Sequence, residues 1–301
     1  MVKILADSLN VATGDRITTY QIGRFPYLML AEAGTHRILN SDGMDEPITE
    51  RLNPFGQEFA RNSGSSRAIP IKKVIDRVRE DPYIPIFTKK QKGMQGEVGN
   101  RIFQVSGKYL WLKALEQTIS IVEEMEKLGV HKQNANHLLK PWMHVPIIVT
   151  GTEWANFFNL RCDEKTHPDF QSIAREMKRQ YDDSKPKELQ PGEWHIPFSD
   201  GLMERDQFTF REKLKIATAR SARISYATHD GIFDYDRDFA LHDMLLADRH
   251  QSPFEHSAMA VAWKDKVCPE YSKLPSGQEI NTRNYRGFLS YRAHLEQNID
   301  V

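Results

Sequence analysis

The chain has 301 residues, 40% of them hydrophobic and 27% charged, which is typical of soluble globular proteins. Its 41 basic and 41 acidic side chains balance, so no global positive charge favours a nucleic-acid duplex, and an anionic ligand must be held by local arginines. Two cysteines, Cys162 and Cys268, exclude a disulfide-rich scaffold and a four-cysteine metal site. No apolar run is long enough for a membrane span or a signal peptide, so we expect a cytoplasmic protein without a membrane partner.

The first third of the chain mixes extended and turn-forming segments. β-branched and aromatic residues alternate over residues 16–22, which predicts a strand, then a turn at Gly23–Pro26 and the start of a helix. Residues 40–58 are rich in Asp, Asn, Gly and Pro and are expected to form a loop. Residues 81–106 carry proline, glycine and charge, which indicates a long irregular excursion.

Apolar residues recur at helical spacing in most of the remaining segments. The expected helices are 69–79 (opened by Pro70), 108–128 (ended by Gly129), 132–139, 151–160, 170–181, 212–226, 235–248 and 284–296. Residues 256–263 suggest a strand, whereas residues 145–149 are too short to classify. The polar residues 182–211 indicate a linker or surface loop, and they are the best candidate for a domain boundary, although the composition forces none.

Residues 59–68 read Phe-Ala-Arg-Asn-Ser-Gly-Ser-Ser-Arg-Ala, and this polar stretch is the most informative feature of the chain. Short N–H and O–H donors stand beside the fixed cations Arg61 and Arg67, a combination that suits a phosphate. The alternative is an exposed polar loop, because serine-rich loops with an arginine are common.

A second polar motif lies on the helix expected at 151–160. Asn156 and Asn159 are three residues apart and share a helix face, and Arg161 stands at its end. An amide in an apolar helix needs a hydrogen-bond partner. The asparagine either caps the helix or makes a buried hydrogen bond within the protein, or it holds a bound heterocycle while Arg161 faces an anion.

The stretch Arg-His-Gln-Ser-Pro-Phe-Glu-His at residues 249–256 suits a helix N-terminus at Ser252. His250 and His256 have no further His or Cys at ligand spacing, so packed or hydrogen-bonded histidines are favoured over a metal site. Neither a Rossmann nor a P-loop fingerprint is present, and Gly-x-Ser-x-Gly is absent as well. No histidine base can be assigned to Cys162, so a cysteine nucleophile is not indicated.

Together these segments resemble the flavin-dependent thymidylate synthases, whose signature is Arg-His-Arg-x-x-Ser-x-Asn-x-x-Ser-x-Arg. Thr35-His36-Arg37 resembles the first three positions and residues 59–67 resemble the remainder, with an insertion at about 38–58. Residues 156–161, 222–226 and 252–256 resemble the family's Asn-Phe-Leu-x-Leu-Arg, Ala-Arg-Val-Ser-Tyr and Ser-Pro-Phe-Glu-His segments. The last two follow the signature instead of preceding it, which resembles a circularly permuted, phage-type branch. Permutation is permissible where the original termini lie close together.

The resemblance implies a single domain over residues 1–301 with an α/β (α+β) fold, an antiparallel or mixed sheet flanked by long helices. It implies a homotetramer with active sites where subunits meet, in the cytoplasm (that of the host if the chain is phage-encoded). FAD would carry the chemistry, NADPH would reduce it, methylenetetrahydrofolate would supply one carbon, and dUMP would become dTMP.

The resemblance also assigns roles by position. Catalysis falls to Ser65 and Arg161; the nucleotide to Glu32, Ser65, Ser66, Arg67, His137 and Arg161; and the flavin to His36, Arg37, Asn62, Asn156 and His256. No metal site is implied. The departures from the family pattern are Thr35 for the first Arg, Ala60 for the first Ser, Ser63 for a Glu, Glu32 for a Gln and His137 for an Arg.

Two other functions stay open at this point. The same scaffold could methylate or hydroxymethylate another nucleotide such as dCMP, because a carboxylate such as Glu32 can accept from a cytosine amino group. The chain could also be a non-catalytic protein that binds flavin or nucleotide, or a structural subunit.

Overall fold

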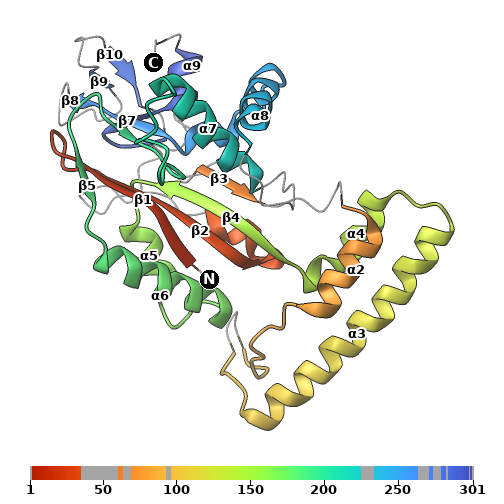
Figure 1. The fold of residues 1–301 in the computed structure, drawn as a ribbon. Helices are drawn as coiled ribbons and strands as arrows, with labels where there is room; N and C mark the ends of the chain where they lie inside the picture. Colours follow the sequence, from red (N-terminus) through yellow and green to blue (C-terminus); the bar gives the residue numbers. More distant parts are fainter. Residues whose placement is uncertain are drawn as a thin grey trace.

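The computed structural model describes residues 2–34, 60–63, 69–92, 96–224, 234–263, 271–273, 279–282, 284–297 and 299 (Figure 1). Its largest sheet has the strand order β3-β4-β2-β1-β5. The strands are β1 (Val2–Asn10), β2 (Arg16–Pro26), β3 (Ala60–Ser63), β4 (His144–Gly151) and β5 (Lys187–Leu189). The pairs β1–β2, β2–β4 and β3–β4 are antiparallel, whereas β5 runs parallel to β1. With the helices described below, this mixed sheet confirms the expected fold class.

One face of this sheet is covered by α5 (Ala155–Arg161) and α6 (Pro168–Asp183). Strand alternation places Tyr20 and Val149 on this face, where they pack with Trp154 and Phe157 in one apolar cluster. The rings of Tyr20 and Trp154 meet edge to face at 5.0 Å. This cluster is the main core behind the sheet.

The opposite face is covered by the C-terminal part of the chain (Figure 1). A three-stranded sheet of β11 (Phe288–Ser290), β7 (Ala258–Ala260) and β6 (Trp194–His195) packs there, and Ile17 and Ala60 join its apolar residues. The surrounding elements are α7 (Phe210–Arg223), α8 (Tyr235–Ala247), the 3-10 turn η3 (Ser252–Glu255), α9 (Tyr291–Glu296), β8 (Ala262–Trp263), β9 (Tyr271–Lys273) and β10 (Glu279–Asn281).

A helical arm extends from the start of β4 (Figure 1). It consists of α2 (Ile71–Glu80), α3 (Arg101–Lys127) and α4 (Lys132–Leu139), with the 3-10 turns η1 (Tyr27–Gly34) and η2 (Lys140–Trp142) at its base. Buried apolar side chains of the three helices form a core of their own. Several apolar side chains on α3 are exposed: Ile102, Phe103, Val105, Tyr109, Leu110 and Ile121.

Most expected helices are confirmed, with shifts at their ends. α3 begins at Arg101 and not at 108, because the Asn100 side chain caps it by accepting from the Phe103 N–H. The last helix is shorter than expected, since β11 takes up residues 288–290.

The strands depart further from expectation. Gly23–Pro26 forms no turn: β2 continues through it with a register shift between Ile22 and Phe25. Pro146 of β4 lies opposite the register shift in β2 and beyond the last residue of β4 that pairs with β3. Its missing N–H therefore interrupts no regular hydrogen-bond pairing with either neighbouring strand. β1 was not predicted, and residues 182–211 contribute β5 and β6 to the two sheets. The expected loop at 40–58 lies outside the described residues. Among the described helices, none combines the length and apolarity that a membrane span requires.

Candidate functional site

Segments that are far apart in the sequence meet at the C-terminal end of β4. Ala60, in the second half of the signature, pairs with Thr150 across β3 and β4, and Asn62 pairs with Ile148. The turn η3 packs against β3, and His256 directly after it is hydrogen-bonded through Nδ1 to Thr150 Oγ1 at 2.8 Å. The helix α5 begins shortly after β4 ends. The β4 end therefore joins three of the motifs found in the sequence.

A chain of five buried polar side chains runs across the sheet to this point, and we call it the hydroxyl–histidine chain. Its members in order are Ser8, His195, Thr19, Thr150 and His256. Ser8 Oγ lies 2.9 Å from His195 Nδ1, and His195 Nε2 lies 2.8 Å from Thr19 Oγ1. The two threonine oxygens are 2.7 Å apart. None of the five is more than 4% exposed.

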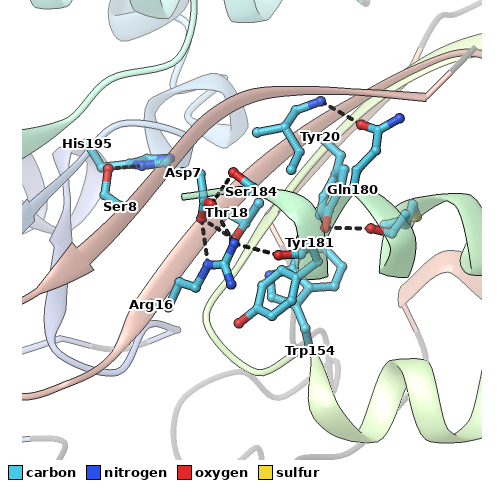
Figure 2. A network of polar contacts seen from close by, with 12 residues as sticks. Asp7, Ser8, Arg16, Thr18, Tyr20, Trp154, Gln180, Tyr181, Ser184 and His195 are labelled. Atoms are coloured by element: carbon cyan, nitrogen blue, oxygen red, sulfur yellow. Dashed lines mark hydrogen bonds and ion pairs between the residues drawn. The ribbon is translucent and has the colours of Figure 1, made fainter. Parts of the chain in front are cut away.

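Strand geometry explains why these side chains line up. Thr19 on β2 and Thr150 on β4 are cross-strand partners and so point to the same face of the sheet. Ser8 on β1 pairs with Ile17, two residues before Thr19, and shares that face. The short strand β6 then places His195 between Ser8 and Thr19, as Figure 2 shows for the Ser8 contact.

Both histidines of the hydroxyl–histidine chain, His195 and His256, are neutral at physiological pH. Burial lowers the pKa of His195 to about 3. Burial also lowers the pKa of His256 to about 3, and the nearby His195 ring adds to the effect. Within the described part of the protein, His256 Nε2 is buried and makes no hydrogen bond. This nitrogen is the end of the hydroxyl–histidine chain that has no hydrogen-bond partner among the described residues.

The segment that carries His256 is held from the C-terminal end of the protein. The Glu255 carboxylate accepts from Arg292 Nη1 at 2.6 Å and from Asn284 Nδ2 at 3.2 Å. The Tyr285 hydroxyl donates to the Glu255 carbonyl at 2.8 Å. These contacts tie η3 to the C-terminal segment, and together with the packing of η3 against β3 they limit the position of the imidazole.

The other described candidate residues lie around β4 in two groups. Asn156 and Arg161 are half-buried on α5, with the Arg161 guanidinium 5.0 Å from the Phe170 ring centre, whereas Asn159 is exposed. His137 is exposed on α4, and the backbone of Glu32 lies in η1, both near the start of β4. Eight strand residues span about 25 Å, so His137 and His256 are too far apart in one chain to contact the same small group.

Several sequence-based assignments cannot be followed in the structure. His36, Arg37, Ser65, Ser66 and Arg67 lie outside the described residues, as does Thr35, and only the backbone of Asn62 is described. Arg223 of the Ala-Arg-Ile-Ser-Tyr segment binds the buried Asp238 at 2.7 Å and ties α7 to α8. Among described residues no cluster of His, Cys, Asp or Glu could hold a metal ion.

Ser8, Thr19, Thr150 and His195 were not predicted as site residues from the sequence. Hydroxyls inside strands carry no signal of their own, and His195 stands in a stretch that reads as a loop. Burial raises the pKa of the Cys162 thiol, which favours its protonated, unreactive form.

The mixed five-stranded sheet, with α5 and α6 on one face and a second sheet with further helices on the other, defines an α/β protein, and its buried polar side chains end at the motif segment that carries His256. Residues 18–187, more than half of the chain, match the family model described as thymidylate synthase complementing protein. The chain therefore belongs to the thymidylate synthase complementing protein family.

A curated relative is the flavin-dependent thymidylate synthase of Pyrococcus abyssi, which is 31% identical over 83 residues. This match covers 27% of the chain and about a third (33%) of the relative's length. The family match ends before His195 and His256, yet both side chains bond to strands inside it.

Proposed function

We propose that the protein is a flavin-dependent enzyme that transfers one carbon to C5 of a pyrimidine deoxynucleotide, converting dUMP to dTMP with methylenetetrahydrofolate and NADPH. The observation that carries this proposal is the packing of η3 against β3 beside the end of β4, with α5 following β4 in the chain on the other face of the sheet. Each of these elements includes a segment that resembles the flavin-dependent thymidylate synthases.

The residues around His256 suit a flavin ring. A flavin carries several hydrogen-bonding atoms on one edge of a flat ring, and His256 Nε2 is a buried polar atom that no described residue satisfies. We assign His256, Asn62, Asn156, His36 and Arg37 to this cofactor. When bound, FAD would supply the hydride chemistry, while these side chains orient it and exclude water.

Cationic and hydroxyl side chains of the signature would hold the nucleotide. Arg67, Ser65 and Ser66 provide a forked cation beside short donors, as a phosphate requires. Arg161 is half-buried, and its contact with the Phe170 ring limits the guanidinium to few orientations. Glu32 and His137 would contact the nucleotide as well.

A site shared between subunits reconciles the two groups of candidate residues. His137 and the Glu32 backbone lie near the start of β4, far from His256 in the same chain. A neighbouring subunit would bring them together, and the exposed apolar residues of α3 suit such an interface. We therefore propose a homotetramer with sites between subunits, and a single permuted domain over residues 1–301.

The test is to incubate the purified protein with NADPH, methylenetetrahydrofolate and either dUMP or dCMP, and to analyse the nucleotide by mass spectrometry. Methylated dUMP supports the proposal. Methyl or hydroxymethyl transfer to dCMP would replace the substrate and keep the reaction class. A folded, flavin-loaded protein that modifies neither nucleotide would contradict the proposal and favour a non-catalytic binding role.

A further inference from the structure

We propose that His195 is a positioning residue, and that a one-way chain of hydrogen bonds from Ser8 through His195, Thr19 and Thr150 holds His256 as the tautomer with its proton on Nε2. His256 would then offer a buried N–H donor to an acceptor atom of a bound heterocycle. The identity of that heterocycle as a flavin rests on the proposed function, whereas the tautomer does not.

The proton count of the hydroxyl–histidine chain decides its direction. Because both rings are neutral, each has one N–H donor and one acceptor nitrogen. Each hydroxyl has one proton, and the four contacts need four donors. The order of the donors is therefore coupled from one end of the chain to the other.

In the first order, Ser8 donates to His195 Nδ1, and the proton on His195 Nε2 is donated to Thr19. Thr19 then donates to Thr150, and Thr150 donates to His256 Nδ1. Every hydroxyl proton is used once, and the remaining proton of His256 is on Nε2.

In the reversed order, His256 Nδ1 donates to Thr150, and each later bond is turned around until His195 Nδ1 donates to Ser8. The Ser8 proton then needs another acceptor, and the structure shows none for this buried hydroxyl within the described residues. Each mixed order that keeps all four contacts leaves a threonine proton unused instead. The reversed order and each mixed order therefore leave two buried groups unmet, a hydroxyl proton and the acceptor nitrogen Nε2 of His256, whereas the first order leaves only the His256 Nε2–H unmet. Unmet buried polar groups are costly, so the first order is favoured.

The first order also explains the open nitrogen. It places an N–H on His256 Nε2, which is buried and has no acceptor among the described residues. A buried donor without an acceptor points to a ligand that accepts at this position. The remote residues Ser8 and His195 thus act on the ligand only through the tautomer of His256.

Solid-state ¹⁵N NMR of the full-length protein labelled in its histidine rings tests this directly, because ¹⁵N shifts distinguish the two tautomers. The protein has 11 histidines, and a His256→Asn variant identifies the signals of His256 by their loss. We expect the Nε2–H pattern for His256 in wild-type protein without flavin. The Nδ1–H pattern would overturn the proposal.

The decisive variant is Ser8→Ala, which lies four hydrogen bonds from His256. Without the Ser8 hydroxyl both orders leave the same number of unmet groups, so the His256 signals should change to those of a tautomer mixture. Ser8→Thr keeps the hydroxyl and should restore the wild-type pattern. Thr18→Val is the matched control, because Thr18 faces the other side of β2 and bonds to Asp7.

Unchanged His256 signals in folded Ser8→Ala protein would overturn the coupling. In flavin-loaded protein, Ser8→Ala should also shift the flavin absorption maxima and reduction potential, with Thr18→Val unchanged. If the NMR results hold but no flavin binds, the tautomer stands and the proposed function fails. If flavin binds with the wrong tautomer, the positioning role fails and the proposed function stands.

Discussion

The two faces of the five-stranded sheet both carry apolar clusters, but their buried polar side chains are arranged differently. On the α5–α6 face, Tyr20, Val149 and Trp154 form a dry apolar core, and the main polar cluster is the closed one around Asp7 and Arg16 (Figure 2). On the other face, hydroxyls and imidazoles form a chain with an open end at His256. Satisfied groups stabilise a fold, whereas an open buried group points to a ligand. We therefore expect changes on the α5–α6 face to act on stability alone, and changes in the hydroxyl–histidine chain to act on ligand binding as well.

The largest effect is expected on the apolar face. Trp154 is 2% exposed and packs on Tyr20, Phe157 and Phe158, so Trp154→Ala should lower the free energy of unfolding by about 3–5 kcal/mol. Urea denaturation measures this. Leu160→Ala on α5, the helix that Trp154 directly precedes, is the control, because Leu160 is 42% exposed and its loss should change stability by about 0.5 kcal/mol or less. Equal losses would contradict the assignment of this face to stability.

Lowering the pH should reduce the free energy of unfolding through the two buried histidines of the hydroxyl–histidine chain. The unfolded state protonates its histidines below about pH 6.5, whereas His195 and His256 stay neutral in the fold down to about pH 3. The unfolded state therefore binds more protons in this window, and stability falls as the pH drops, by about 2 kcal/mol per histidine at pH 5. Denaturation series at pH 7, 6 and 5 should show a shallower loss for His195→Gln than for wild-type protein. An identical pH slope would contradict the burial of a neutral ring.

Adjacent threonines on β2 allow the two faces to be compared directly. Thr19→Val interrupts the hydroxyl–histidine chain, and Thr18→Val removes a hydroxyl that donates to Asp7 on the other face. Both residues are fully buried, so each change should cost about 1–3 kcal/mol of unfolding free energy. Only Thr19→Val should also weaken FAD binding, measured by fluorescence titration. Equal FAD affinity in the two variants would argue against a functional polar face.

The smallest effect on the free energy of unfolding is expected for Arg292, a partly exposed residue that is paired with Glu255 next to His256. Arg292 is 38% exposed in its ion pair with Glu255, so Arg292→Ala should cost about 1 kcal/mol or less in thermal or urea denaturation. Arg179→Ala, which removes an exposed pair with Glu176 on α6, is the matched control for stability. A loss well above that of Arg179→Ala would show that Arg292 supports more of the fold than its exposure indicates.

The local parts of this fold could be predicted from sequence. Helical periodicity gave α4 at residues 132–139 and located α2 and α6 closely, because one amphipathic pattern suffices for each. β4 could not be classified, since Pro146 interrupts a short apolar run and only the neighbouring strands show why it is tolerated.

The site was predictable only where residues stood in a motif. His256 was found through the Ser-Pro-Phe-Glu-His segment, whereas His195 bonds to Thr19 across 176 residues of sequence. Such a contact depends on sheet pairing and on the position of β6, neither of which a local pattern specifies. Its partners are ordinary threonines and a serine, which become informative only once they are buried together.

If the end of β4 is a flavin site, as proposed, the protein binds FAD, and its flavin content can be measured. Wild-type protein should show flavin absorption as purified or after addition of FAD, and HPLC of the released cofactor should identify FAD. His256→Asn should lower the occupancy while circular dichroism stays unchanged, and the Thr18→Val control should retain it. A folded wild-type protein that takes up no FAD at micromolar concentration, or undiminished occupancy in His256→Asn, would show that the end of β4 is not a flavin site.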